Sequence, residues 1–165
     1  MPTNFLESAG TNGFIATPFN LMSTELNSLA NGSAATSSVG GTSGVFTQTN
    51  FANAIWSEIY FTAGGAFTPT AGGFIAGWYL KSPDGGSTYE SAISTPSTTV
   101  MALPRSPDFI IPFDAVALAA NNQKWGQSYF KNPWPTCKVL IQNLTGAALY
   151  SSGNLIKAGP VATQY

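Results

Sequence analysis

The chain has 165 residues, of which six are lysine or arginine, seven are aspartate or glutamate and none is histidine. Its charged fraction of 8% compares with about 25% in typical soluble domains. The lack of histidine excludes a Ser/His/Asp triad, a Cys/His dyad and a histidine-rich metal site, so we expect no enzyme, no metal and no cofactor. A net charge of −1 gives no long-range field, which makes nucleic acid and anionic membranes poor partners.

We expect a surface with so few charges to be buried in an interface in the functional protein, against copies of the chain or another protein. The alternative is a neutral monomer that its many serine, threonine and asparagine side chains keep soluble. The length predicts one domain with a substantial core.

The lone Cys137 excludes an intrachain disulfide. Its apolar neighbours at 139–141 favour a buried small hydrophobe over a reactive thiol. Residues 1–7 carry no secretory signal, and no apolar run reaches the roughly 18 residues of a membrane span. We therefore expect a soluble chain that is made in the cytoplasm.

Residues 1–24 predict an extended N-terminal arm, followed by a β-sandwich domain over 25–165. The large apolar side chains of Phe5, Phe14 and Phe19 stand among Asn, Thr and Gly, without sustained helical or strand periodicity. They would act as pegs against another surface. The alternative is a short edge strand packed on its own domain.

A series of short strands is predicted after the arm. Asn31 and Gly32 form a turn signal ahead of a strand. Residues 55–62 alternate, with Ile59 and Phe61 on one face. Further strands are predicted at 74–80, 99–103, 109–113, 115–119, 136–143 and 154–158. Roughly eight strands with Gly/Pro turns and no amphipathic helix predict an all-β fold, an antiparallel sandwich or barrel.

Two loops resemble ligand-binding motifs only in part. The glycine-rich residues 40–44 lack the Gly-Lys-Ser/Thr of a phosphate-binding loop. Residues 84–86 (Asp-Gly-Gly) lack the remaining ligands of a calcium loop and predict a hairpin turn. Neither loop is expected to bind a nucleotide or a metal ion.

A carboxylate pair, as in glycoside hydrolysis, is the one catalytic device that the composition leaves open. Glu58 would be the first acid, and Glu90, Asp108 or Asp114 the second, but no spacing selects among them. An isolated glutamate on a strand is more often solvated or paired with a lysine. We therefore expect no catalysis from these residues.

An aromatic and basic cluster occupies residues 124–134. Its members are Lys124, Trp125, Tyr129, Phe130, Lys131 and Trp134. Tryptophan and tyrosine are enriched in the binding hot spots of protein interfaces, which favours a protein contact. Two alternatives stay open: the aromatic side chains plug one end of the sandwich, or they form a platform that stacks on a sugar ring.

Several segments, taken in order, resemble the small decoration, or cement, proteins of tailed-phage heads, of the kind found on short-tailed phages. They begin with LNSLANGSAAT at 26–36, and they end with KVLIQNLTG at 138–146 and SSGNL at 151–155. Between these lie the segments 55–62, 69–80 and 82–89. Each motif is mostly turn chemistry, and the ordered set carries the resemblance.

The resemblance implies a jelly-roll-like β-sandwich that docks on the outer surface of the capsid. It implies a structural virion protein that binds the major capsid protein, bridges neighbouring capsid subunits as a dimer or trimer, and stabilises the shell without catalysis. The expected contact residues are Phe5, Phe14, Phe19, Trp125, Tyr129, Phe130 and Trp134. The alternative function is a carbohydrate-binding sandwich, in which Trp125, Tyr129 and Trp134 stack on sugar, or another virion component such as a tail or fibre part.

Overall fold

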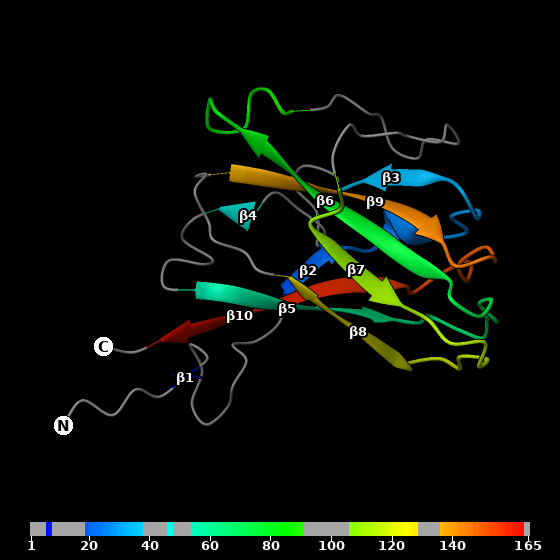
Figure 1. Cartoon of the computed structure of the whole chain (residues 1–165). Helices are drawn as coiled ribbons and strands as arrows, with labels where there is room; N and C mark the ends of the chain where they lie inside the picture. The colour runs from blue at the N-terminus through cyan, green and yellow to red at the C-terminus, as the bar shows by residue number, and fades with distance from the viewer. Residues whose placement is uncertain are drawn as a thin grey trace.

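The chain forms a two-layer antiparallel β-sandwich (Figure 1), which confirms the predicted all-β sandwich class. The structure is a computed structural model. It describes residues 6–7, 19–37, 46–47, 54–90, 106–128 and 136–163.

Each layer is a sheet of four strands. The first has the order β2-β10-β5-β8 and consists of β2 (Phe19–Met22), β10 (Leu155–Thr163), β5 (Ala54–Thr62) and β8 (Gln123–Ser128). The second has the order β3-β9-β6-β7 and consists of β3 (Ala34–Thr36), β9 (Thr136–Leu144), β6 (Phe74–Ser82) and β7 (Phe109–Pro112).

Three short elements complete the described chain. The two-residue strands β1 (Leu6–Glu7) and β4 (Phe46–Thr47) pair with β10 and β9. A single 3-10 turn, η1 (Thr24–Leu26), follows β2. The two sheets meet along one side, where β7 and β8 pair at Ile110 and Gln127.

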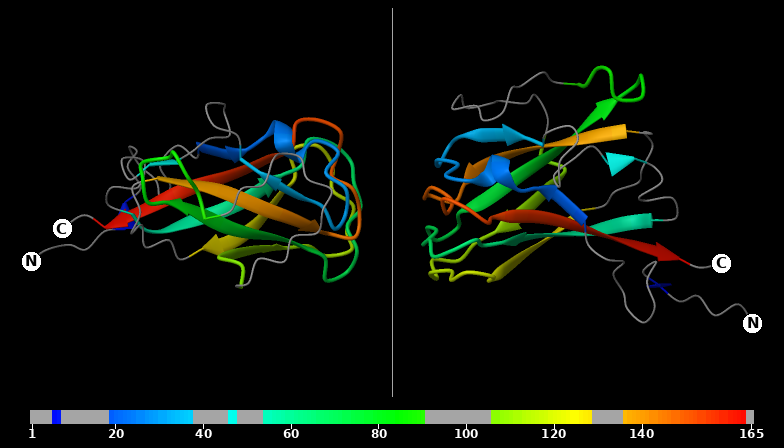
Figure 2. Two further views of the ribbon diagram at one scale, coloured as in Figure 1. Left: turned by 90° about the horizontal axis from the view of Figure 1, so that it is seen from above. Right: turned by 180° about the vertical axis from the view of Figure 1, so that it is seen from behind.

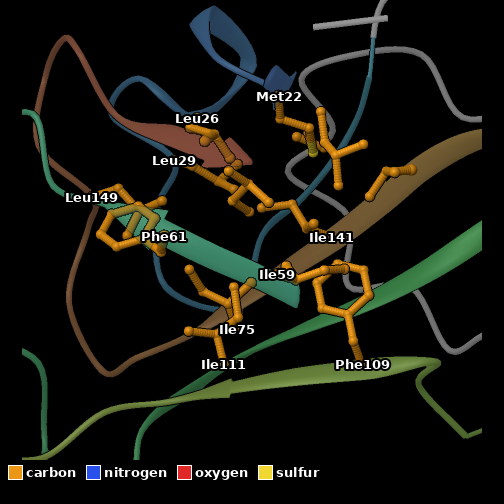
Figure 3. Close-up of a cluster of buried hydrophobic side chains, with 14 of the residues drawn as sticks. Met22, Leu26, Leu29, Ile59, Phe61, Ile75, Phe109, Ile111, Ile141 and Leu149 are labelled. Atoms are coloured by element: carbon orange, nitrogen blue, oxygen red, sulfur yellow. The ribbon is translucent and has the colours of Figure 1, made fainter. Parts of the chain in front are cut away.

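A hydrophobic core fills the space between the sheets because alternate residues of each strand point inward. Figure 3 shows Ile59, Ile75 and Ile141 converging there from three strands, and each is fully buried. Phe61 packs edge-to-face with Phe67, at 5.8 Å between ring centroids. Burial of each such side chain contributes about 1.5–3 kcal/mol, so the core carries most of the stability of the sandwich.

The central strand β6 is buried on both faces, unlike β7. Its outward side chains Trp78 and Leu80 form a second buried cluster with Leu140 and Ala34. β7 alternates instead, with buried Phe109 and Ile111 between exposed Ile110 and Pro112. The outer surface of the second sheet is therefore covered at β6 and open at β7.

Five of the predicted strands coincide with β5, β6, β7, β9 and β10. The strand predicted at 115–119 is wrong. This segment is a loop whose side chains are exposed except for Leu118, which makes an isolated bridge to Phe67. With one buried position it has no apolar face to offer a sheet. The strand predicted at 99–103 lies outside the described residues.

Part of the predicted arm belongs to the sandwich. β2 pairs with β10, and its Leu21 and Met22 are fully buried in the core. The alternative of a strand packed on its own domain therefore holds for 19–22. Phe19 pairs with Ala158 in this ladder, whereas Phe5 and Phe14 lie outside the described residues.

Candidate functional site

Four loops gather at one end of the sandwich, the right-hand end in Figure 1, and all views in Figures 1 and 2 place the last residues of β10 at the other end. They are residues 27–33, 63–73, 113–122 and 145–154, and together we call them the loop end. Each connects strands of the sandwich, which explains why they converge.

Backbone hydrogen bonds between different loops hold the loop end together. The Ser28 N–H donates to the Tyr150 carbonyl at 3.1 Å, and the Thr70 N–H donates to the Thr145 carbonyl at 2.7 Å. Phe67 and Leu118 exchange two bonds, at 3.2 and 2.9 Å. Each loop is thus tied to another by its main chain.

The side chain of buried Asn143, near the end of β9, forms four hydrogen bonds with the loops of the loop end. Its amide nitrogen donates to the carbonyls of Leu29 and Ala147, both at 2.8 Å. Its amide oxygen accepts bonds from the Thr145 backbone N–H at 3.1 Å and the Thr145 hydroxyl at 2.8 Å. The Leu29 carbonyl also accepts from the Leu149 N–H, and the Ala147 carbonyl also accepts from the Thr145 hydroxyl, both at 3.0 Å. The Asn143 amide therefore adds a second bond to each carbonyl, at a point where strand pairing has ended.

Asn154 and Asn31 repeat this device on a smaller scale. The Asn154 amide joins Gly64 N–H, at 3.1 Å, to the Tyr150 carbonyl. Asn31 accepts a bond from Gly146 N–H at 2.8 Å. Gly146 has φ = 84°, a conformation that favours glycine, which explains the glycine in the turn after Asn143.

The surface of the loop end is almost uncharged, and it mixes exposed apolar side chains with serine, threonine and asparagine. Val116 is 59% exposed and Tyr150 is 38% exposed, with several exposed alanines such as Ala119 and Ala148 around them. The sequences of these four loops contain one aspartate, Asp114, and no glutamate, lysine or arginine. The loop end therefore presents a pre-ordered, neutral surface.

A second candidate surface is an open groove beside Trp125, at the junction of β7 and β8. Its volume is about 640 Å³. It is lined by Pro107, Asp108, Phe109, Ile110, Pro112, Trp125 and Gly126. Trp125 is 48% exposed, and its ring stacks on that of Tyr60 in β5, with centroids 4.6 Å apart and planes at 29°. Because Tyr60 is itself buried, the stack fixes the tryptophan ring on the sheet.

The groove exists because the β7–β8 ladder ends early. Phe113 N–H donates to the Gly73 carbonyl on the β6 side, so the nitrogen of Pro112 faces β8, where proline has no hydrogen to donate. A side chain at Gly126 would also collide with β7, since its Cβ would lie within 2.4 Å of the Ile110 carbonyl oxygen. The two strands pair at Ile110 and Gln127 and approach closely at Gly126.

Few charges act near either surface. Lys124 of β8 pairs with Asp114 of the loop end at 2.5 Å, and the hydrogen bond from Lys124 holds the pKa of Asp114 below its ordinary value. Asp108, at the mouth of the groove, accepts the Tyr79 backbone N–H at 2.7 Å. Among the described residues that line the groove, none is a lysine or an arginine.

Of the predicted contact residues in the 124–134 cluster, the structure describes the side chain of Trp125. Its exposure means that it does not plug the core. Tyr129, Phe130 and Trp134 lie outside the described residues. β8 itself was missed as a strand because its sequence, QKWGQS, has one apolar side chain.

Of the four candidate carboxylates, the structure describes the side chains of Glu90, Asp108 and Asp114. Asp108 and Asp114 have separate partners, as above, and the Glu90 backbone N–H donates to the Lys81 carbonyl at 3.1 Å. Glu58 lies in β5, and its side chain is outside the described set. In the described part of the chain, no three His, Cys, Asp or Glu residues lie close enough together to hold a metal ion.

Cys137 is buried in the core, as predicted. Burial raises the pKa of its thiol to about 11, and a protonated thiol is a poor nucleophile. The cysteine is therefore a packing residue.

The loop end was harder to predict from the sequence. Its exposed Val116 lies in the small apolar run 115–120, whose composition favoured a strand. The hydrogen-bonding role of Asn143 depends on carbonyls of distant loops, and only the Asn-Leu-Thr-Gly turn signal at 143–146 pointed to this position.

Comparison of the chain with protein-family models, curated proteins and solved structures finds no match. Among the described residues, no helix is long and apolar enough to cross a membrane.

Proposed function

We propose that this chain is a structural virion protein that binds the outer surface of a phage capsid through its loop end and bridges neighbouring capsid subunits. The observation that carries the proposal is the combination of rigidity, exposed apolar side chains and near absence of charge at the loop end. Virion assembly by such a protein requires contact and involves no catalytic step or cofactor.

We further propose that the sandwich is a jelly roll, as the resemblance to cement proteins implies. The pairing of β6 with β7, β5 with β8, β3 with β9 and β2 with β10 supports this topology. These pairs are nested, so the chain folds back on itself as one long hairpin that is wound into two sheets, the pattern of a double Greek key.

The rigidity of the loop end favours docking on another protein. Loops that are already fixed by hydrogen bonds, such as those of Asn143 and Asn154, lose little conformational entropy when they bind. Neutral, apolar surface such as that of Val116 and Tyr150 is typical of the centre of protein interfaces, where charged residues are depleted. Such contacts depend little on salt.

Multivalency would turn a modest contact into shell stabilisation. A subunit that touches two capsid proteins forms its second contact at high effective concentration, so the capsid proteins cannot separate without breaking both contacts. A dimer or trimer of the chain would extend this bridge further. The major capsid protein and further copies of the chain are thus the proposed partners.

Co-sedimentation with undecorated heads of its own phage tests the proposal. We expect saturable binding at a simple ratio to the major capsid protein, little changed by salt. Val116→Asp places a charge at the centre of the loop end and should weaken binding by at least about tenfold. Ile110→Asp is the matched control, because it adds the same charge at an exposed apolar position on β7.

Two results would contradict the proposal. Absence of binding by the folded wild-type protein would remove the capsid role. Loss of binding with Ile110→Asp but not with Val116→Asp would move the docking surface from the loop end to the groove.

A further inference from the structure

We infer that the groove beside Trp125 is a binding site for a neutral pyranose sugar, which stacks on the tryptophan ring and donates a hydroxyl hydrogen bond to Asp108. This site is separate from the capsid-docking surface, and its argument does not depend on the capsid role.

The Trp125 ring is exposed and is held in one orientation. The indole of Trp125 is 48% exposed. Covering it with a flat, partly apolar group removes apolar surface from water, which is favourable. The ring is held against buried Tyr60 at 4.6 Å, so its orientation is set before any ligand arrives. A pre-ordered aromatic face of this kind suits the C–H surface of a sugar ring, through dispersion and weak C–H···π contact.

The groove wall combines apolar surface with a carboxylate. Ile110 and Pro112 supply apolar surface beside Trp125, and Asp108 supplies a carboxylate at the mouth. The Tyr79 N–H bond at 2.7 Å positions that carboxylate. A carboxylate accepts several hydrogen bonds at once, so a carboxylate that already accepts bonds from the protein can still accept a sugar hydroxyl.

The charge of the groove selects the class of ligand. Among the described residues, the groove lining contains one acid and no lysine or arginine, which disfavours phosphate, sulfate and acidic sugars. A wholly apolar ligand would leave Asp108 desolvated and would favour a more enclosed pocket. A neutral ligand with an apolar face and donor hydroxyls fits both constraints, and about 640 Å³ is enough for a short oligosaccharide.

Saturation-transfer NMR with the purified full chain tests the site, with cellobiose, lactose and maltose as probes. One exposed aromatic platform predicts weak affinity, with a Kd of about 1 mM, so each sugar is added at about 10 mM. We expect transfer from the protein to the ring C–H protons of at least one sugar. Trp125→Ala should weaken binding by at least about tenfold, whereas Trp125→Phe, which keeps an aromatic face, should retain more of it.

Further variants separate the parts of the site. Asp108→Asn keeps an oxygen for the Tyr79 N–H and should weaken sugar binding by about fivefold, because the bond to a charged acceptor is stronger. Val116→Asp, at the loop end, should bind sugar like the wild type. Thermal melts confirm that each variant is folded.

Two results would overturn the sugar site. One is absence of transfer from all three sugars, and the other is equal binding by Trp125→Ala and the wild type. If sugars do not bind and Trp125→Ala loses binding to phage heads, the groove is a protein contact. Neither result affects the expectation that Val116→Asp releases the protein from heads, so the two proposals fail separately.

Discussion

The loop end and the Trp125 groove are built in opposite ways. At the loop end, backbone and asparagine bonds tie four loops together, and the surface left outside is nearly uncharged, with exposed apolar side chains such as Val116. At the groove, a ladder stops early because Pro112 cannot donate toward β8, and an aromatic ring is left exposed beside a carboxylate. The loop end is closed by added hydrogen bonds, whereas the groove is opened by a missing one.

This difference shows how a chain with few charges can still carry two distinct surfaces. The amide groups of Asn143 and Asn154 form hydrogen bonds inside the loop end, where both residues are fully buried. Exposed apolar side chains such as Val116 remain on its exterior. The groove keeps its polar atom, the Asp108 carboxylate, at the surface. We therefore expect substitutions at the loop end to affect stability strongly, and those at the groove to affect ligand binding with smaller effects on stability.

The largest expected effect is that of Asn143→Ala. It removes both donors to the Leu29 and Ala147 carbonyls and the acceptor for Thr145. Each of these four bonds contributes about 0.5–1.5 kcal/mol, so we expect the free energy of unfolding to fall by about 3 kcal/mol. Urea unfolding monitored by circular dichroism measures it.

Asn31→Ala is the matched control within the loop end. Asn31 is exposed and accepts one bond, from Gly146, so its loss should cost less than about 1 kcal/mol. If the two alanine variants unfold at the same urea concentration, the backbone bonds alone hold the loops and the role assigned to Asn143 is wrong.

The next effect concerns the junction of the two sheets. Gly126→Ala would place a Cβ within 2.4 Å of the Ile110 carbonyl oxygen and 2.9 Å of Ile111 Cγ1. Backbone must move to accommodate it, and we expect destabilisation of about 2 kcal/mol. The indole N–H resonance of Trp125, one residue away, should shift as β7 and β8 separate. Gln123→Ala, exposed on the same strand, should stay within about 0.5 kcal/mol of wild type.

The sequence predicted the sandwich because strand periodicity and turn chemistry are local. Residues 55–62 and 74–80 alternate or run apolar for the length of a strand, and Asn-Gly and Pro-Asp-Gly-Gly mark turns. β2 was difficult to predict from its own sequence, because these four residues of a Gly- and Asn-rich stretch form a strand only beside β10. The misread loop 115–119 shows the converse, apolar composition without a partner strand.

The two surfaces were less predictable than the fold. The sequence pointed to Trp125 as part of an aromatic cluster, but its exposure and its stack on Tyr60 depend on the pairing of β5 with β8. The loop end required knowing that loops more than a hundred residues apart meet, as Leu29 and Asn143 do. Such contacts are set by topology and leave no local pattern.

The smallest expected effect tests whether the two surfaces are coupled. The Asp114–Lys124 pair joins the loop end to β8, and it lowers the pKa of Asp114 from its ordinary 3.8. A carboxylate whose pKa is lowered by folding contributes stability that is complete above pH about 4 and is lost as pH falls through the lowered pKa. Because the pair is exposed to solvent, we expect Asp114→Asn to leave the unfolding midpoint at pH 7 nearly unchanged.

Carbon-detected NMR titration of the side-chain carboxyls gives the sharper measurement. Lys124→Gln should return the pKa of Asp114 toward 3.8. Asp84, whose pKa of about 2 is set by hydrogen bonds from Thr88 and Ser82, is the internal reference and should not move. If Lys124→Gln also weakens binding to phage heads or to sugars, the ion pair transmits between the surfaces. Unchanged binding at both would mean that the loop end and the groove act independently, as their separate construction predicts.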